Sequence, residues 1–199
     1  MDTATAARYR VRGYPTVLVL NEKGQELDRV VGYYRAPQFM SQVEDYLAGR
    51  NTLASMIAEE HLNKSSAESV YRLGDRLADH GRFDESRERF ARVMKLDPKN
   101  KTGHVDDAIY RLARMARKDK DYESDRKYAQ MILDRYADSD MMRPAFLEVG
   151  ISLKKAGKFE KARKQFLQYS ARFPDDEDAP WAREQADTLA TQITHRPGA

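Results

Sequence analysis

The spacing of apolar residues along the chain changes near residue 50. Beyond it, from about Ser66 to Thr194, apolar residues recur every three or four positions, which places them on one face of an α-helix. One stripe contains Val70, Leu73, Gly74 and Leu77, and the next contains Phe90, Val93 and Met94. Gly81 lies between the two stripes and predicts a turn, so we expect a pair of amphipathic helices here.

Parts of this helical pattern occur more than once. The triplet Tyr71-Arg72-Leu73 returns as Tyr110-Arg111-Leu112, and the stretch GRFDES at 81–86 returns as GKFEKA at 157–162. The distance between the two triplets is somewhat longer than about 34 residues, a common period for repeated helix pairs. Such a period predicts a solenoid built from helix-turn-helix units.

These units resemble the tetratricopeptide repeat, which has small residues where its two helices cross, an aromatic residue in the second helix and a proline at its end. The first and third units fit this pattern closely. The middle unit fits it less well, because it has no glycine at the turn and has Ala137 in place of the proline. The matching residues are Leu73, Gly74, Leu77, Ser86, Phe90, Val93 and Pro98 in the first unit, Leu112, Ala113, Ala116, Tyr128 and Ile132 in the middle unit, and Val149, Gly150, Leu153, Ala162, Phe166, Tyr169 and Pro174 in the third.

The small residues have a steric role in this pattern, because they let the second helix of a unit approach the first. The expected pairs of a small residue with the aromatic that fills the space beside it are Gly74 with Phe90, Ala113 with Tyr128, and Gly150 with Phe166. The expected fold is therefore mainly α, a tetratricopeptide-type solenoid of about three units with a small α/β segment before it. We place the units at about 67–100, 105–138 and 143–175 within 67–199, a capping helix at 178–194, and a connector helix at 51–66 that carries Leu53, Met56, Ile57 and Leu62.

The pattern before residue 50 is that of a hairpin followed by a helix. TVLVLN at 16–21 and QELDRVVGYY at 25–34 are β-rich runs separated by a turn at NEKG, and APQFMSQVEDYLAG at 36–49 is amphipathic. With the helical stretch TATAARYRV at 3–11, these elements resemble the C-terminal half of a thioredoxin-like fold over residues 1–50. The most specific part is GYPT at 13–16, where the resemblance implies a cis proline at Tyr14-Pro15, while Gly24 and Gly32 fit the hairpin turn and the end of the last strand.

The half of the thioredoxin fold that carries Cys-x-x-Cys has no counterpart in this sequence. Two explanations are open: the chain is the downstream part of a longer thioredoxin-repeat protein, which we favour, or the half-domain pairs with something else. In either case the strand at 16–20 would have an open edge. Such edges recruit partners, so we expect a homodimer through 16–20.

Composition and charge narrow the range of functions. Lys+Arg total 35 against 32 for Asp+Glu and are spread through the chain, which gives no support to nucleic-acid binding. No apolar run is long enough to insert into a membrane, and the helix at 51–66 has too little positive charge to favour a membrane surface. The chain has no cysteine and its four histidines are far apart, so we expect no thiol chemistry, no metal and no cofactor. The acidic run at 175–178 lacks the spacing of a calcium loop and is expected to cap the following helix.

The sequence favours a binding protein over an enzyme. No nucleophile-base pair, carboxylate pair or phosphate-binding loop has a signature here, so no catalytic residue is expected. The resemblance implies a concave face lined by the first helix of each unit, which would bind a peptide or protein. The positions expected on that face include Tyr71, Asp75, Tyr110, Arg114, Arg117, Lys118, Lys154 and Lys155. They run from acidic to basic, which favours an acidic partner, but an ordinary solvated surface explains the same charges.

A second function, of a different class, stays open. Family members that hold a C-terminal carboxylate use lysine and asparagine, whereas Tyr71 and Asp75 occupy the corresponding positions, which argues against that role. The second function is that of the C-terminal part of a thioredoxin-like oxidoreductase or redox-associated chaperone. In that case Tyr14 and Pro15 would hold an extended substrate, and the Cys-x-x-Cys half would lie upstream. The compartment is not fixed by the sequence: cytoplasmic as the chain stands, or the bacterial periplasm if it ends a longer exported protein.

Overall fold

The described residues of the protein are mainly helical, with one two-stranded sheet near the N-terminus. A computed structural model describes residues 3–11, 13–62 and 66–194. The chain divides into two compact units, one up to residue 102 and one from residue 103 on. No helix in the described part of the chain is both long and apolar enough to cross a membrane.

The first unit begins with the predicted hairpin and its helices. Its elements are α1 (Thr3–Arg8), β1 (Thr16–Leu20), β2 (Glu26–Val31) and α2 (Ala36–Leu47). The strands are antiparallel, with Thr16 opposite Val31 and an irregularity between Val19 and Leu20. β2 is shorter than the β-rich run predicted it to be, because Gly32 follows it with φ +97°, a left-handed conformation that breaks the extended backbone. The hairpin core consists of Val19, Val30 and Tyr46, with Leu27, Phe39 and Val43 packed against it.

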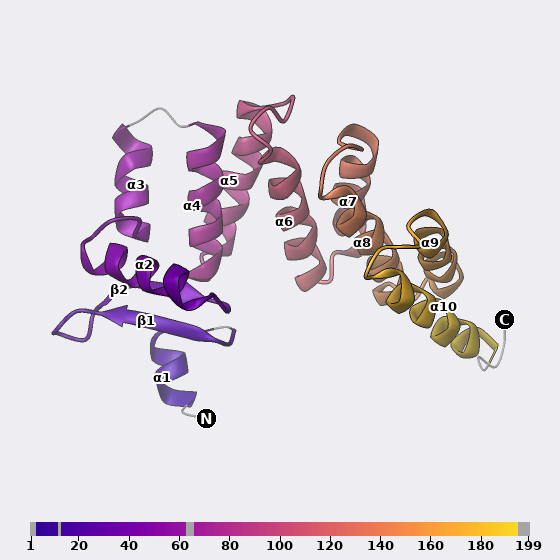
Figure 1. The fold of residues 1–199 in the computed structure, drawn as a ribbon, viewed down its shortest axis with the longest axis horizontal. Coiled ribbons are helices and arrows are strands. Elements are labelled where there is room, and N and C mark those ends of the chain that lie inside the picture. Colours follow the sequence, from indigo (N-terminus) through magenta and orange to yellow (C-terminus); the bar gives the residue numbers. More distant parts are fainter. Residues whose placement is uncertain (1–2, 12, 63–65, 195–199) are drawn as a thin grey trace. The chain divides into compact units, whose positions relative to one another are not determined.

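Three helices complete the first unit: α3 (Leu53–Leu62), α4 (Ala67–Asp79) and α5 (Phe83–Leu96). They lie side by side in Figure 1. Leu53 is buried against Leu73 and Leu77 of α4, with Met56 and Ile57 beside it. Leu62 is wrongly included in that apolar face, because it is 83% exposed. Residues 63–65 of the predicted connector lie outside the described residues.

Asp28 of β2 joins the hairpin to the helices of the first unit. Its carboxylate is fully buried and accepts hydrogen bonds from the backbone N–H groups of Leu53 and Arg29. Arg76 of α4 lies 3.4 Å from Asp28 Oδ1, and His80 Nε2 lies 2.9 Å from the same oxygen. The hairpin is therefore part of the same compact unit as the first helix pair, through a polar network that no short-range sequence pattern predicts.

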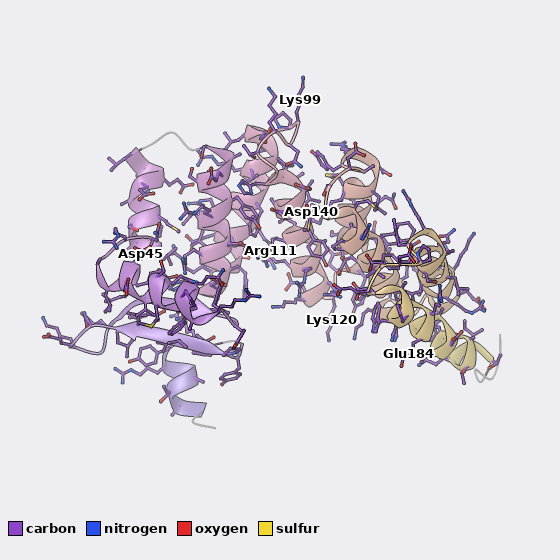
Figure 2. The ribbon with its side chains drawn as sticks, viewed as in Figure 1. Asp45, Lys99, Arg111, Lys120, Asp140 and Glu184 are labelled. Carbon is purple, nitrogen blue, oxygen red and sulfur yellow. The ribbon has the colours of Figure 1, made fainter. Side chains whose placement is uncertain are left out.

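Between residues 103 and 194, the described part of the second unit has five helices, each packed on the next: α6 (Val105–Lys118), α7 (Tyr122–Arg135), α8 (Met142–Lys155), α9 (Phe159–Arg172) and α10 (Ala179–Thr194). Figure 1 shows them from magenta to yellow. The loop before this unit, which carries Lys99 (Figure 2), is held by Asp97, whose carboxylate accepts hydrogen bonds from Lys101 and Thr102 at 2.9 and 2.7 Å. The last helix covers the end of the helix stack, with Trp181 edge-on to Phe166 at 5.6 Å between ring centroids.

The predicted helix crossings are present in the first and third helix pairs. A Cβ atom on Gly74 would lie 2.9 Å from Phe90 Cε1, and one on Gly150 would lie 2.7 Å from Phe166 Cε1. The middle pair differs from the prediction. There the fully buried residue is Ala129, one position after Tyr128, which is only half-buried. Ala129 follows Ala113 by the same sixteen positions that separate Gly74 from Phe90, so the predicted pairing of Ala113 with Tyr128 is wrong by one residue.

The acidic run at 175–178 organises the turn before α10. Asp176 accepts hydrogen bonds from the Tyr169 hydroxyl at 2.6 Å and from the backbone N–H of Asp178 at 3.0 Å, and its other oxygen lies 2.8 Å from Arg143 Nη1. The hydrogen bond from Tyr169 and the nearby charges hold the pKa of Asp176 below its usual range. Among the described residues, no three His, Cys, Asp or Glu side chains are grouped so that they could hold a metal ion.

Candidate partner-binding site

The basic residues predicted to bind a partner lie on two helices of the second unit, α6 and α8, which pack against each other. α6 has Asp106 and Asp107 in its first turn and Arg117 and Lys118 in its last turn. This order places each charge at the end of the helix dipole that it stabilises. The helix therefore begins acidic and ends in a cationic turn.

The structure brings three of the predicted residues together around one carboxylate. The charges of Arg114 and Arg117 act on Tyr110 and on Glu148 of α8, so these four side chains form one cluster across the two helices. Arg117 Nε lies 3.0 Å from Glu148 Oε1. Arg114 is exposed, while Tyr110 and Arg117 are half-buried, so the cluster has cationic and aromatic groups at the surface and a carboxylate below it.

The remaining predicted residues of this unit are arranged differently. Lys154 Nζ donates a hydrogen bond to Gln185 Oε1 of α10 at 2.6 Å, which directs its ammonium group toward the last helix. Lys118 and Lys155 are exposed at the C-terminal ends of α6 and α8, where their charges complement the helix dipoles. The predicted basic residues therefore divide into two arginines that cluster with Glu148 and three lysines in the last turns of α6 and α8.

Two acidic residues of the site are absent from the sequence prediction. Glu148 is 1% exposed and Asp125 of α7 is fully buried. Asp125 occupies the repeat position of Ser86 and Ala162, which are small and buried in the other two helix pairs. A charged residue at a repeat position that otherwise holds a small one is the sequence signal that points to Asp125. The small Ala129 follows it one helical turn later and is also fully buried.

Burial dominates the electrostatics of this carboxyl pair. It raises the pKa of Glu148 to about 7, with the charge of Arg117 opposing the shift and that of Asp125 adding to it. Burial also raises the pKa of Asp125 and of the Tyr110 phenol. A desolvated carboxyl group beside a second one favours its neutral form. The pair therefore holds a proton on the acidic side of neutrality.

Comparison with known families agrees with the two patterns in the chain. Tetratricopeptide-repeat models match residues 71–140 and 144–176, and a thioredoxin-like domain matches residues 1–47. The chain is a tetratricopeptide-repeat protein with a thioredoxin-like N-terminal segment. A solved structure titled "MamA RS-1 ArsTM double mutant" is similar in fold, with a TM-score of 0.55 and 18% sequence identity over 79% of this chain and 90% of that chain. No curated protein matches the sequence.

The tetratricopeptide repeat in the first unit carries the other two predicted partner-binding residues. Tyr71 is half-buried and its ring lies 5.7 Å from that of Phe90, so part of its surface stabilises the repeat. Asp75 is half-buried one turn further along α4. Sequence register places both residues on the first helix of their repeat, and their role in binding stays a prediction.

The thioredoxin-like segment has the predicted cis peptide bond between Tyr14 and Pro15. The Pro15 carbonyl accepts a hydrogen bond from Gly32 N at 2.9 Å, and the Thr16 hydroxyl donates one to the Gly13 carbonyl at 2.7 Å. Tyr14 is 63% exposed. These contacts hold the start of β1 against the end of β2, while the chain contains no cysteine that could act there.

Proposed function

We propose that this protein is a non-catalytic scaffold that binds a protein or peptide through the first helices of its tetratricopeptide repeats. The observation that carries the proposal is the cluster of Tyr110, Arg114 and Arg117 on α6, beside the adjoining helix α8. Arginine and tyrosine are the residue types that contribute most to protein interfaces, because they combine a large contact area with hydrogen bonding. The repeats support a protein partner rather than a small substrate.

The proposed partner carries acidic groups. Arg114, Lys118 and Lys155 are exposed on these helices, and an arginine fork fits a carboxylate with two parallel hydrogen bonds. Glu148 is buried beneath Arg117, so it does not present its charge directly to a partner at the surface. Electrostatic steering by exposed cations weakens as salt screens it, so the association rate of such a partner should fall with ionic strength.

The structure suggests which substitutions test this proposal without disturbing the fold. Arg117 is unsuitable for charge reversal because it faces the buried Glu148, and Lys154 is hydrogen-bonded to Gln185. A triple variant, Arg114→Glu, Lys118→Glu and Lys155→Glu, changes three exposed residues. The matched control is Lys158→Glu, Lys161→Glu and Lys164→Glu at and along α9, which makes the same change in net charge at exposed positions.

Partners are first captured from a lysate of the source organism with the wild-type chain and then titrated individually. We expect the triple variant to weaken binding roughly tenfold or more, in the range of interface residues that matter, and the control to change it less than about threefold. Circular dichroism verifies that both variants keep the wild-type helix content. Equal affinity of the triple variant and the wild type would place the partner surface elsewhere.

The thioredoxin-like match supports a second function, as part of an oxidoreductase. We infer that these residues have no thiol-disulfide activity of their own, since the 199-residue sequence contains no cysteine to supply the thiolate. An insulin reduction assay with dithiothreitol measures this directly. Turnover at the rate without protein supports the scaffold, and turnover clearly above it supports the enzyme.

A further inference from the structure

We propose that the buried carboxyl pair Asp125 and Glu148 controls how available Arg117 is to an acidic partner, so that proton uptake by the pair strengthens binding. This inference rests on the proposed function for the choice of partner. It assigns to the site a control by pH that the repeat family does not imply. The geometry of the pair carries it.

The two buried carboxyl groups receive few hydrogen bonds from the groups around them. Both side-chain oxygens of Asp125 and Oε1 of Glu148 are buried; within the described ranges neither Asp125 oxygen has a donor in good hydrogen-bond geometry, and Glu148 Oε1 has the ion pair with Arg117 Nε at 3.0 Å. The nearby Ser152 hydroxyl donates to the Tyr122 carbonyl at 3.0 Å, and its interaction with Asp125 lowers the pKa of that carboxyl by less than burial raises it. Buried carboxylates with so few donors are costly, so the pair gains most from being partly neutral.

The balance of charge around the pair comes from three helices. α6 contributes Tyr110, Arg114 and Arg117, α7 contributes Asp125 and Arg126, and α8 contributes Glu148. Arg126 Nη1 reaches only to 3.5 Å from the Ser152 hydroxyl oxygen, whereas Arg117 Nε is 3.0 Å from Glu148 Oε1. Arg117 is therefore the cation that responds most directly to the charge of Glu148.

The state of the pair determines what a partner meets at the surface. When Glu148 is ionised, it neutralises Arg117 and competes with a partner carboxylate for the same guanidinium group. When the pair holds its extra proton, the cluster gains one net positive charge, and Arg117 has no ionised competitor at 3.0 Å. Because coupling between two ligands is reciprocal, binding of an acidic partner should also make the pair retain its proton.

The first experiment measures binding of a fluorescein-labelled hexaglutamate peptide to the full chain at low ionic strength, at about pH 6 and about pH 8, on either side of the expected transition. Wild-type protein should bind roughly fivefold more tightly at the lower pH, the lower end of ordinary coupling between sites. Glu148→Gln should bind with the tighter affinity at both values. Glu160→Gln, which changes an exposed glutamate on α9, is the matched control and should keep the wild-type pH dependence.

The second experiment needs no ligand and follows the carboxyl carbon of Glu148 by NMR through a pH titration. We expect a midpoint near neutrality, and a higher midpoint in Arg117→Gln because a stabilising positive charge is removed. A midpoint in the ordinary range of glutamate, or one that Arg117→Gln leaves unchanged, overturns the inference. So does peptide binding whose pH dependence is the same in Glu148→Gln as in the wild type.

The two measurements separate failure of the inference from failure of the proposed function. If the wild type binds no hexaglutamate at either pH, the acidic-partner proposal is wrong and the claim that the pair regulates such binding falls with it. If the peptide binds equally at both pH values while Glu148 titrates near neutrality, the proposed function stands and the inference is overturned. Tighter binding at about pH 6 that Glu148→Gln abolishes supports both.

Discussion

At the level of single residues, the presence or absence of a side chain determines how the two helices of each repeat cross. Gly74 and Gly150 face Phe90 and Phe166 so closely that one added methyl group meets the ring. The middle repeat reaches the same buried position with Ala129. Because protein interiors are close-packed, the size of the residue on one helix of each repeat limits the size of the side chain that faces it on the other.

Gly150→Leu should therefore destabilise the second unit more than Gly157→Ala. The first substitution forces a side chain against Phe166, with an overpacking cost of roughly 2 kcal/mol or more. The second meets no atom within 4 Å and costs only the strain of alanine at φ +72°, about 1 kcal/mol. Urea denaturation measures both. The repeat register is wrong if the two midpoints coincide, and Phe166→Ala combined with Gly150→Leu should cost less than the sum of the two.

Glu148 makes the stability of the second unit depend on pH. Its pKa in the folded protein is about 7 against an ordinary value of 4.5, so the folded state holds a proton that the unfolded state has lost between these values. The stabilisation is fully present below about pH 4.5 and is lost as the pH rises through about 7, by at most about 3 kcal/mol. Glu148→Gln should remove most of this change in the free energy of unfolding with pH, measured by urea denaturation at pH values below and above this window. If the variant keeps the wild-type pH dependence of stability, that dependence comes from other titratable groups.

At the level of elements, the hairpin depends on helices that follow it in the sequence. Burial alone would raise the pKa of Asp28, but the hydrogen bond from His80 and the charge of Arg76 outweigh burial and hold the pKa below its usual range. Arg76 also donates to the Arg29 carbonyl at 3.2 Å and lies over the Tyr46 ring. One arginine of α4 thus contacts β2 and α2 together, and through them contributes to the hairpin core.

Asp28→Asn should destabilise the first unit by about 3 kcal/mol, because it removes one charge of a buried network and leaves Arg76 without its counter-ion. The contribution of the carboxylate is present above its ordinary pKa of 3.8 and is lost as the pH falls below it. Asp45→Asn is the control, since Asp45 bonds Arg50 and Asn51 at the surface and its loss should change stability little. Equal effects of the two variants in urea denaturation would show that Asp28 does not hold the hairpin.

At the level of the whole molecule, the compact units and the sequence repeats have different boundaries. The thioredoxin-like segment and the first tetratricopeptide repeat share one unit, and the other two repeats form the second with α10. The segment nevertheless contains only β1 and β2 in its sheet, among the residues described. β1 pairs with β2 alone, and Val17 and Leu20 are 41% and 37% exposed.

We expect this edge of β1 to drive self-association of the chain. An open, apolar strand edge pairs readily with another strand, and a second copy of the chain offers an identical one. Val17→Lys should reduce the average mass measured by light scattering at high concentration, because lysines facing each other across a strand pair repel. Met40→Lys, on α2 and 51% exposed, adds the same charge away from the edge and should leave the mass unchanged. A wild-type chain that stays monomeric across concentration contradicts the expectation.

Sequence alone determined the fold, because the periodic spacing of apolar residues and the small residues at helix crossings are local consequences of helix geometry. The pairs Gly74 with Phe90 and Gly150 with Phe166 followed from such patterns, and the hairpin from its β-rich runs, while the cis proline at Pro15 followed from the resemblance to a thioredoxin-like fold. The register of the middle repeat did not, since adjacent Tyr128 and Ala129 fit the spacing about equally well until packing buries one of them.

Only the tertiary structure decided which charges are free and which are buried. Arg114 and Arg117 have the same chemistry in the sequence, but Arg114 is exposed, whereas Arg117 is half-buried and lies 3.0 Å from Glu148 Oε1. In the sequence, Asp28 and Asp125 look like ordinary surface acids. In the folded chain Asp28 contacts His80, which is fifty-two positions away, and Asp125 interacts with Glu148 of the next helix. Desolvation depends on every element packed around a group, so the ionisation of the site is a property of the folded unit and not of its local sequence.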